Sequence, residues 1–69
     1  MDSIKERLSH ALQEVGQLHP NWRYGQVVAN VAAWAGADEP ADVWNVSDEE
    51  LLRAALEHLR SQAARSAIR

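Results

Sequence analysis

The sequence has 69 residues, no cysteine, and ten acidic against seven basic side chains, which gives a formal net charge of −3. A chain this short buries only about 60 % of the surface of its unfolded form, so it can build one thin hydrophobic core at most. The lack of cysteine excludes a disulfide framework, a cysteine-based metal site and a thiol nucleophile. The first residues lack the apolar run of a secretory signal and no segment approaches transmembrane length, so we expect a cytoplasmic protein without a membrane partner.

The first predicted helix spans residues 3–17. Ser3 and Glu6 have the S-x-x-E spacing of a capping box, in which each side chain satisfies the other residue's backbone N–H. Apolar residues then recur at helical spacing and form one stripe: Ile4, Leu8, Ala11, Leu12 and Val15. Pro20 disfavours the helical conformation at His19, so the helix is expected to end there.

The second predicted helix spans residues 21–35. Pro20 or Asn21 would serve its first turn, and Gly36 would end it in a left-handed conformation. Its expected inward stripe consists of Tyr24, Val27, Val28, Val31, Trp34 and Ala35. Because this segment is so apolar, we expect it to lie centrally, covered by the other two helices.

The third predicted helix spans residues 48–64, after an ordered acidic linker over residues 37–46. In the linker, Asp42 is expected to cap a single helical turn, and Val43, Trp44 and Val46 to hold the segment in place. Ser47 and Glu50 form a second capping box at the start of the third helix. The large apolar residues become sparse after Arg60, so we predict a frayed tail over residues 65–69. Together these elements predict a small all-α, three-helix domain over residues 1–69.

Charge is distributed unevenly along the chain. Residues 36–50 carry six acids and no base: Asp38, Glu39, Asp42, Asp48, Glu49 and Glu50. The last three lie in the first turn of a helix, where the dipole favours acids, so they need no functional explanation. The loop acids Asp38, Glu39 and Asp42 could form a docking face for a basic partner or mimic a row of phosphates, but the sequence favours an ordinary hydrated loop. The spacing of these acids is not that of a calcium loop. The sequence also has no broad basic face of the kind that binds duplex nucleic acid.

Arg23, Gln26 and Asn30 form a polar stripe on the second predicted helix, at spacings i, i+3 and i+7. These side chains could converge on an acidic or amide-bearing ligand. Alternatively, Gln26 and Asn30 could bind the backbone of the linker and satisfy polar groups there. The sequence favours the structural role, since buried amides usually serve in this way.

Three tryptophans, Trp22, Trp34 and Trp44, are many for a chain of this length. Trp is common in cores and as an anchor of interfaces. We expect a core or dimer contact for Trp34 and, with less support, for Trp22, which lies at a helix start. The alternative is that these tryptophans stack a base or a flat ligand.

Catalysis, metal binding and cofactor binding are not predicted. His10, His19 and His58 lie on three separate segments, and no H-E-x-x-H or paired-histidine motif is present. The sequence also lacks a glycine-rich phosphate loop, and a bundle of this size offers little room for a pocket that excludes water.

Residues 19–52 resemble a group of short uncharacterised bacterial and phage proteins. The shared pattern runs from His19-Pro20 through Trp22-Arg23, Gly25-Gln26 and Asn30, then through Asp42-Val43-Trp44 to the helix start Asp48-Glu49-Glu50-Leu51. Asn45-Val46-Ser47 departs from it, because an acid or an aromatic residue is commoner there. The resemblance implies a bacterial or phage origin and no mechanism.

Two hypotheses for function follow. The first is a non-enzymatic protein-interaction module, like an adaptor or an inhibitor, which binds a protein partner or a second copy of itself through Trp22, Trp44 and the acidic linker. The second is a small-ligand or nucleotide-binding protein that uses Arg23, Gln26 and Asn30.

Overall fold

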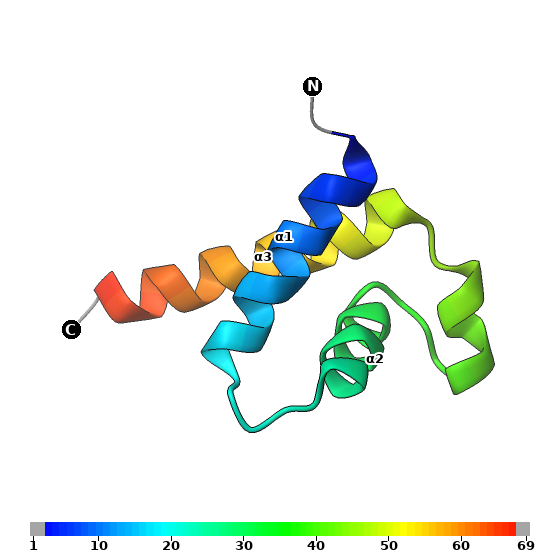
Figure 1. Cartoon of the computed structure of the whole chain (residues 1–69), viewed down its shortest axis with the longest axis horizontal. Coiled ribbons are helices and arrows are strands. Elements are labelled where there is room, and N and C mark those ends of the chain that lie inside the picture. Colours follow the sequence, from blue (N-terminus) through cyan, green and yellow to red (C-terminus); the bar gives the residue numbers. More distant parts are fainter. Residues whose placement is uncertain (1–2, 68–69) are drawn as a thin grey trace.

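The structure, a computed structural model, describes residues 3–67, without the side chains of residues 40–41 and 66–67. It consists of α1 (Ile4–Leu18), α2 (Tyr24–Trp34), the 3-10 helix η1 (Pro40–Asn45) and α3 (Asp48–Ala67) (Figure 1). No strand occurs in this described range. The predicted all-α fold with three α-helices is therefore confirmed. No helix in residues 3–67 is long and apolar enough to cross a bilayer.

Local signals in the sequence determine both ends of α1. The Ser3 hydroxyl accepts a hydrogen bond from the Glu6 backbone N–H at 3.2 Å, as the capping box predicts. At the other end His19 leaves the helical conformation, with φ −128° and ψ 70°, and its N–H binds the Gly16 carbonyl. Pro20 explains this end, because a residue before proline is disfavoured in the helical region.

The helix α2 begins at Tyr24, later than the predicted residue 21. Residues 19–22 form a turn instead, in which the Trp22 N–H donates to the His19 carbonyl at 3.0 Å. Gly36 ends the helix as predicted, with a positive φ of 110°. Around this glycine, the N–H groups of Gly36 and Ala37 bind the carbonyls of Ala33 and Ala32, which satisfies the last turn of the helix.

The linker is ordered, and η1 forms its centre. The Asp42 carboxylate accepts from the Glu39 N–H at 3.2 Å, so Asp42 caps this short helix from within. Ser47 then caps α3, where its hydroxyl accepts from the Glu50 N–H at 3.1 Å. The helix α3 continues to Ala67, past the predicted end at residue 64, so residues 65–67 are helical rather than frayed. The rest of the predicted frayed tail, residues 68–69, lies outside the described residues.

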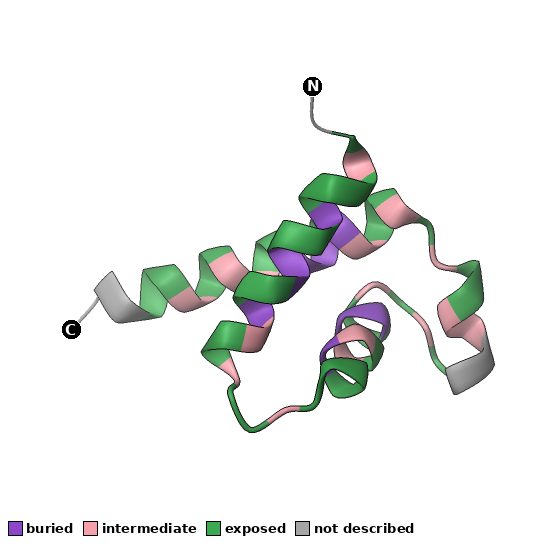
Figure 2. Cartoon of the chain, in the orientation of Figure 1, coloured by how far each residue is buried: buried purple, intermediate pink, exposed green. Residues whose placement is uncertain are grey.

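The core lies where α1 crosses α3, with one side of α2 packed against the crossing (Figure 2). The pairing of α1 with α3 is the most extensive in the molecule. The expectation that α2 is central is therefore wrong. Its apolar character is satisfied on one side only, through Val27, Val31 and Ala32. The buried core cluster consists of Leu8, Ala11, Leu12, Val15, Val27, Val31, Leu52, Ala54 and Ala55.

Two residues of α2 that were expected to face inward are exposed. Tyr24 is 57 % exposed and Trp34 is 42 % exposed, because α2 lies at the side of the molecule rather than at its centre. In α3, Leu56 is exposed, whereas Ala54 and Ala55 are in the core. The face of α3 that contains Ala54, Ala55 and His58 therefore turns toward α1 and α2.

Candidate functional site

The predicted polar stripe is on the surface of α2 and its side chains do not converge. Arg23 and Gln26 are exposed and Asn30 is half-buried. The Gln26 side-chain oxygen accepts from the Arg23 backbone N–H at 2.7 Å, so Gln26 caps the start of the helix. Within the described residues, Asn30 has no side-chain hydrogen bond to the linker, and the expected tie between helix and linker is not formed.

Trp44 is the most exposed large apolar residue of the described chain. Its exposed fraction is 91 %, so the expectation that it holds the linker in place is wrong. Val43 and Val46 on either side are half-buried, and η1 contacts α2. A 3-10 helix has three residues per turn, so neighbouring side chains on it diverge, and Trp44 is left facing outward.

Acidic residues lie in and directly before η1. The segment that contains η1 is at one edge of the molecule (Figure 1). Asp38 and Glu39 precede the helix and are exposed, while Asp42 is half-buried in its capping role. Asp48, by contrast, is paired with Lys5 of α1 at 2.8 Å. This hydrogen bond and the negative charge of Asp48 raise the pKa of the Lys5 ammonium. The candidate residues Asp38, Glu39, Asp42 and Trp44 thus lie in η1 or directly before it. We call Asp38, Glu39 and Asp42 the acidic segment.

Four aromatic rings form a cluster that the sequence did not predict. His19 stacks on Trp22 with ring centroids 3.9 Å apart and planes 9° from parallel. His58 stacks on Trp34 with centroids 4.1 Å apart. The Nε2 atoms of the two histidines are 3.0 Å apart, and the two tryptophans are 6.3 Å apart between ring centroids. We call these four residues the His–Trp cluster.

The His–Trp cluster joins three elements. His19 and Trp22 belong to the turn between α1 and α2, Trp34 is the last residue of α2, and His58 is in the middle of α3. Trp22 is half-buried against the core. It is therefore less accessible than the protein-interaction hypothesis expected for a residue that binds a partner. One ring nitrogen of the histidine pair can donate and the other accept, as two neutral imidazoles require.

Burial lowers the pKa of His58, and the nearby His19 and Arg65 lower it further because a second positive charge is unfavourable there. His58 therefore favours the neutral form, in which one ring nitrogen can accept a hydrogen bond.

One signal in the sequence could have indicated His58. It follows Leu51, Ala54 and Ala55 at helical spacing and so continues the inward face of α3. His19 carried no such signal, because its position depends on a turn whose direction follows from how α2 packs. The two residues are 39 positions apart, which no local pattern bridges.

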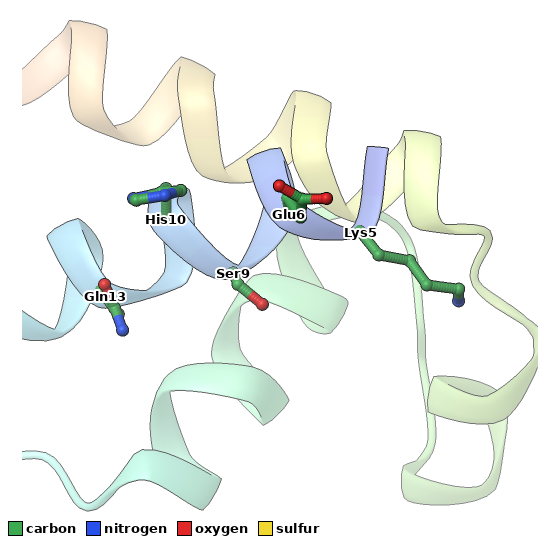
Figure 3. Close-up of a pocket in the computed structure, with 5 residues that line it drawn as sticks. All are labelled: Lys5, Glu6, Ser9, His10 and Gln13. Atoms are coloured by element: carbon green, nitrogen blue, oxygen red, sulfur yellow. The ribbon is translucent and has the colours of Figure 1, made fainter. Parts of the chain in front are cut away.

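The surface hollows do not form an enclosed pocket around polar groups. One hollow of about 270 Å³ lies along α1 and is lined by Lys5, Glu6, Ser9, His10 and Gln13. All five come from a single helix, and their side chains extend outward in different directions (Figure 3). Another, of about 520 Å³, lies between α1 and α3 beside Leu18 and Leu59. Neither hollow contains Arg23, Gln26 or Asn30.

Among the residues whose placement is described, no group of three or more histidine or acidic side chains is arranged to hold a metal ion. Comparison with protein-family models, with curated proteins and with solved structures finds no match for this chain.

Proposed function

We propose that the chain is a cytoplasmic, non-enzymatic protein-interaction module that inserts Trp44 into an apolar pocket bordered by basic residues on a protein partner. The observation that carries the proposal is the 91 % exposure of Trp44, which lies between the half-buried Val43 and Val46. A tryptophan side chain can bury about 150–250 Å² in a contact, so leaving one in water forgoes a large hydrophobic gain. Tryptophan is also among the residues that contribute most to binding at interfaces.

Charge determines the kind of partner. Asp38 and Glu39 are exposed next to η1, and no basic residue occurs between residues 36 and 50. Acidic groups at the rim of an interface attract a basic partner and speed its association, and salt weakens this effect. A partner with Lys or Arg around an apolar pocket therefore matches both features of the segment.

The ligand-binding alternative has less support. Gln26 already uses its side-chain oxygen to cap α2, and neither Arg23 nor Asn30 lines the surface hollows described above. A small ligand would have to replace the capping bond or bind at an open surface, where it would bury little of its own area.

Affinity capture from bacterial cells with three baits tests the proposal. The baits are the parent chain, Trp44→Ala, and Tyr24→Ala as a matched control that removes another exposed aromatic ring. We expect a partner that the parent and Tyr24→Ala retain, that Trp44→Ala loses, and that 0.5 M salt weakens; its purified form should bind with the same pattern.

Retention by Trp44→Ala, or equal loss from both variants, would overturn the proposal. If sedimentation shows that the parent chain is a dimer and Trp44→Ala a monomer, the occupant is a second copy of the chain and the proposal of a basic partner fails.

A further inference from the structure

The four rings of the His–Trp cluster contact one another in a closed circle. His19 stacks on Trp22, and His58 stacks on Trp34. The two tryptophans are tilted neighbours, and the two histidines meet through their Nε2 atoms. One stacked pair belongs to the turn between α1 and α2, and the other joins the end of α2 to α3. The contact between the histidines is therefore the place where the turn meets α3.

The two imidazoles face each other head-on. Their Nε2 atoms are 3.0 Å apart and their ring centroids 5.2 Å apart, which is the nitrogen separation plus one ring radius on each side. Both nitrogens therefore lie near the line that joins the ring centres, as in a straight N–H···N hydrogen bond. Such a bond needs a proton on one of these nitrogens and a lone pair on the other.

Protonation changes this contact in two steps. A first proton, taken up at Nδ1 of the donor ring, leaves the N–H···N bond in place and makes it charge-assisted. A second proton must occupy the accepting Nε2 atom, because a histidine cation carries hydrogen on both ring nitrogens. Two N–H groups then point at each other across 3.0 Å, where neither can accept and both rings are positive.

We propose that the histidine pair is a pH-sensitive switch: when both imidazoles carry a proton, the turn of residues 19–22 moves away from α3 and exposes Trp22. The two stacked pairs stay intact, since a positive imidazole lies favourably on the face of an indole. Trp22 thus leaves the core with His19, while Trp34 stays on His58. These residues are not those that carry the proposed function, so neither proposal depends on the other.

The charges around the pair do not compensate for a second proton. On α3, Arg65 disfavours a positive charge at His58, while Glu57 brings a negative charge to a surface hollow that His58 lines. The helix α2 has no charged side chain, the turn is followed by the exposed Arg23, and Glu14 of α1 lines the hollow between α1 and α3. Within the described residues, neither histidine forms an ion pair with an acid.

The position of His58 sets the pH range of the switch. Burial, together with the charges of His19 and Arg65, lowers the pKa of His58 below its ordinary value near 6.5. The second proton is therefore taken up in more acidic solution than an isolated histidine would need, and the pair stays bonded at neutral pH.

NMR with a soluble nitroxide, which broadens the signals of exposed groups, measures the accessibility of each indole N–H in the full chain. We expect the Trp22 signal to broaden about twofold more at pH 4.5 than at pH 7.5, because the turn has opened. Trp44 is already exposed and should broaden equally at both pH values. His19→Phe and His58→Phe keep a ring for stacking but remove the nitrogens, so both should abolish the response of Trp22. His10→Phe, at an exposed position of α1, is the matched control and should respond as the parent does.

A pH titration of the parent chain alone keeps the test independent of how the variants fold. The chemical shifts of the His19 and His58 imidazoles report when each ring is protonated. Exposure of Trp22 should follow the second protonation while the amide signals of α1 and α3 stay in place. The proposal is overturned by a Trp22 that stays covered after both rings are protonated, or by a pair that takes up no second proton down to pH 4.5. Loss of the α1 and α3 signals together with the change at Trp22, or the same pH response in His58→Phe, would overturn it as well.

Discussion

The indole of Trp34 lies against the imidazole of His58, with ring centroids 4.1 Å apart and planes 23° from parallel. This contact joins the last residue of α2 to the middle of α3. Stacked aromatic pairs contribute about 0.5–1.5 kcal/mol beyond the area that they bury. Because α2 buries few side chains, the contact is a substantial part of what holds that helix against α3.

The first prediction concerns pH. Burial, His19 and Arg65 lower the pKa of folded His58 below its ordinary value near 6.5, so the unfolded chain binds more protons in acid. The stability that neutral His58 contributes is complete above about pH 6.5, its ordinary unfolded value, and is lost as the pH falls toward the lowered folded pKa. Urea unfolding between pH 8 and pH 5 should show this decline.

His58→Phe keeps the ring on Trp34 and should flatten the same curve, whereas His10→Phe should not change it. An equal decline in His58→Phe would assign the pH dependence to other groups.

The second prediction concerns the cap of α3. Ser47→Ala removes the hydroxyl that accepts from the Glu50 N–H, and we expect a loss of about 1 kcal/mol in the free energy of unfolding. Ser61→Ala, at an exposed position inside the same helix, serves as the control and should change stability little. Chemical denaturation measures both, and equal midpoints for the two variants would refute the capping role.

Gly25, in the first turn of α2, and Gly36, just beyond its end, should respond to alanine in opposite ways. A Cβ at Gly25 would meet open space, so Gly25→Ala should stabilise the protein by up to about 1 kcal/mol. Gly36 has a φ of 110°, where a Cβ is strained, so Gly36→Ala should destabilise it by about 1–2 kcal/mol. Thermal unfolding of the two variants tests this prediction. A shift of the melting temperature in the same direction for both variants would contradict it.

The fourth prediction separates two roles for Asn30. With no side-chain hydrogen bond to the described linker, Asn30→Leu should leave the free energy of unfolding within about 0.5 kcal/mol of the parent. A loss of about 1–3 kcal/mol would show that the amide satisfies a buried polar group after all. Equilibrium unfolding in urea is sufficient to distinguish these results.

Features that depend on neighbouring residues could be predicted from the sequence. The caps at Ser3 and Ser47 and the left-handed Gly36 each depend on a few consecutive residues, and the structure contains all three. The side position of α2 could not be predicted, because an apolar helix looks the same in a sequence whether one face or all faces are covered. Trp44 was misjudged for a related reason, since an aromatic residue in a linker can pack inward or face solvent.

The same distinction, between features set by neighbouring residues and features set by the tertiary arrangement, separates the candidate sites. Trp44 and the acidic segment are neighbours in the chain, so composition alone identified them as a possible surface. His19 and His58 meet only after α1 and α3 have crossed and α2 has turned back beside them. Such a pair requires the tertiary arrangement, which hydrophobic spacing does not specify for short helices.

The small share of the core contributed by α2 has a consequence for how the molecule fluctuates. Only Val27, Val31 and Ala32 of this helix are buried, whereas α1 and α3 bury most of the remaining core against each other. A local opening that releases α2 would therefore expose little apolar surface and leave the crossing of α1 and α3 intact. Amide protons of α2 should accordingly exchange with solvent well before those at the α1–α3 crossing, through a partly open form in which the valine face is briefly uncovered.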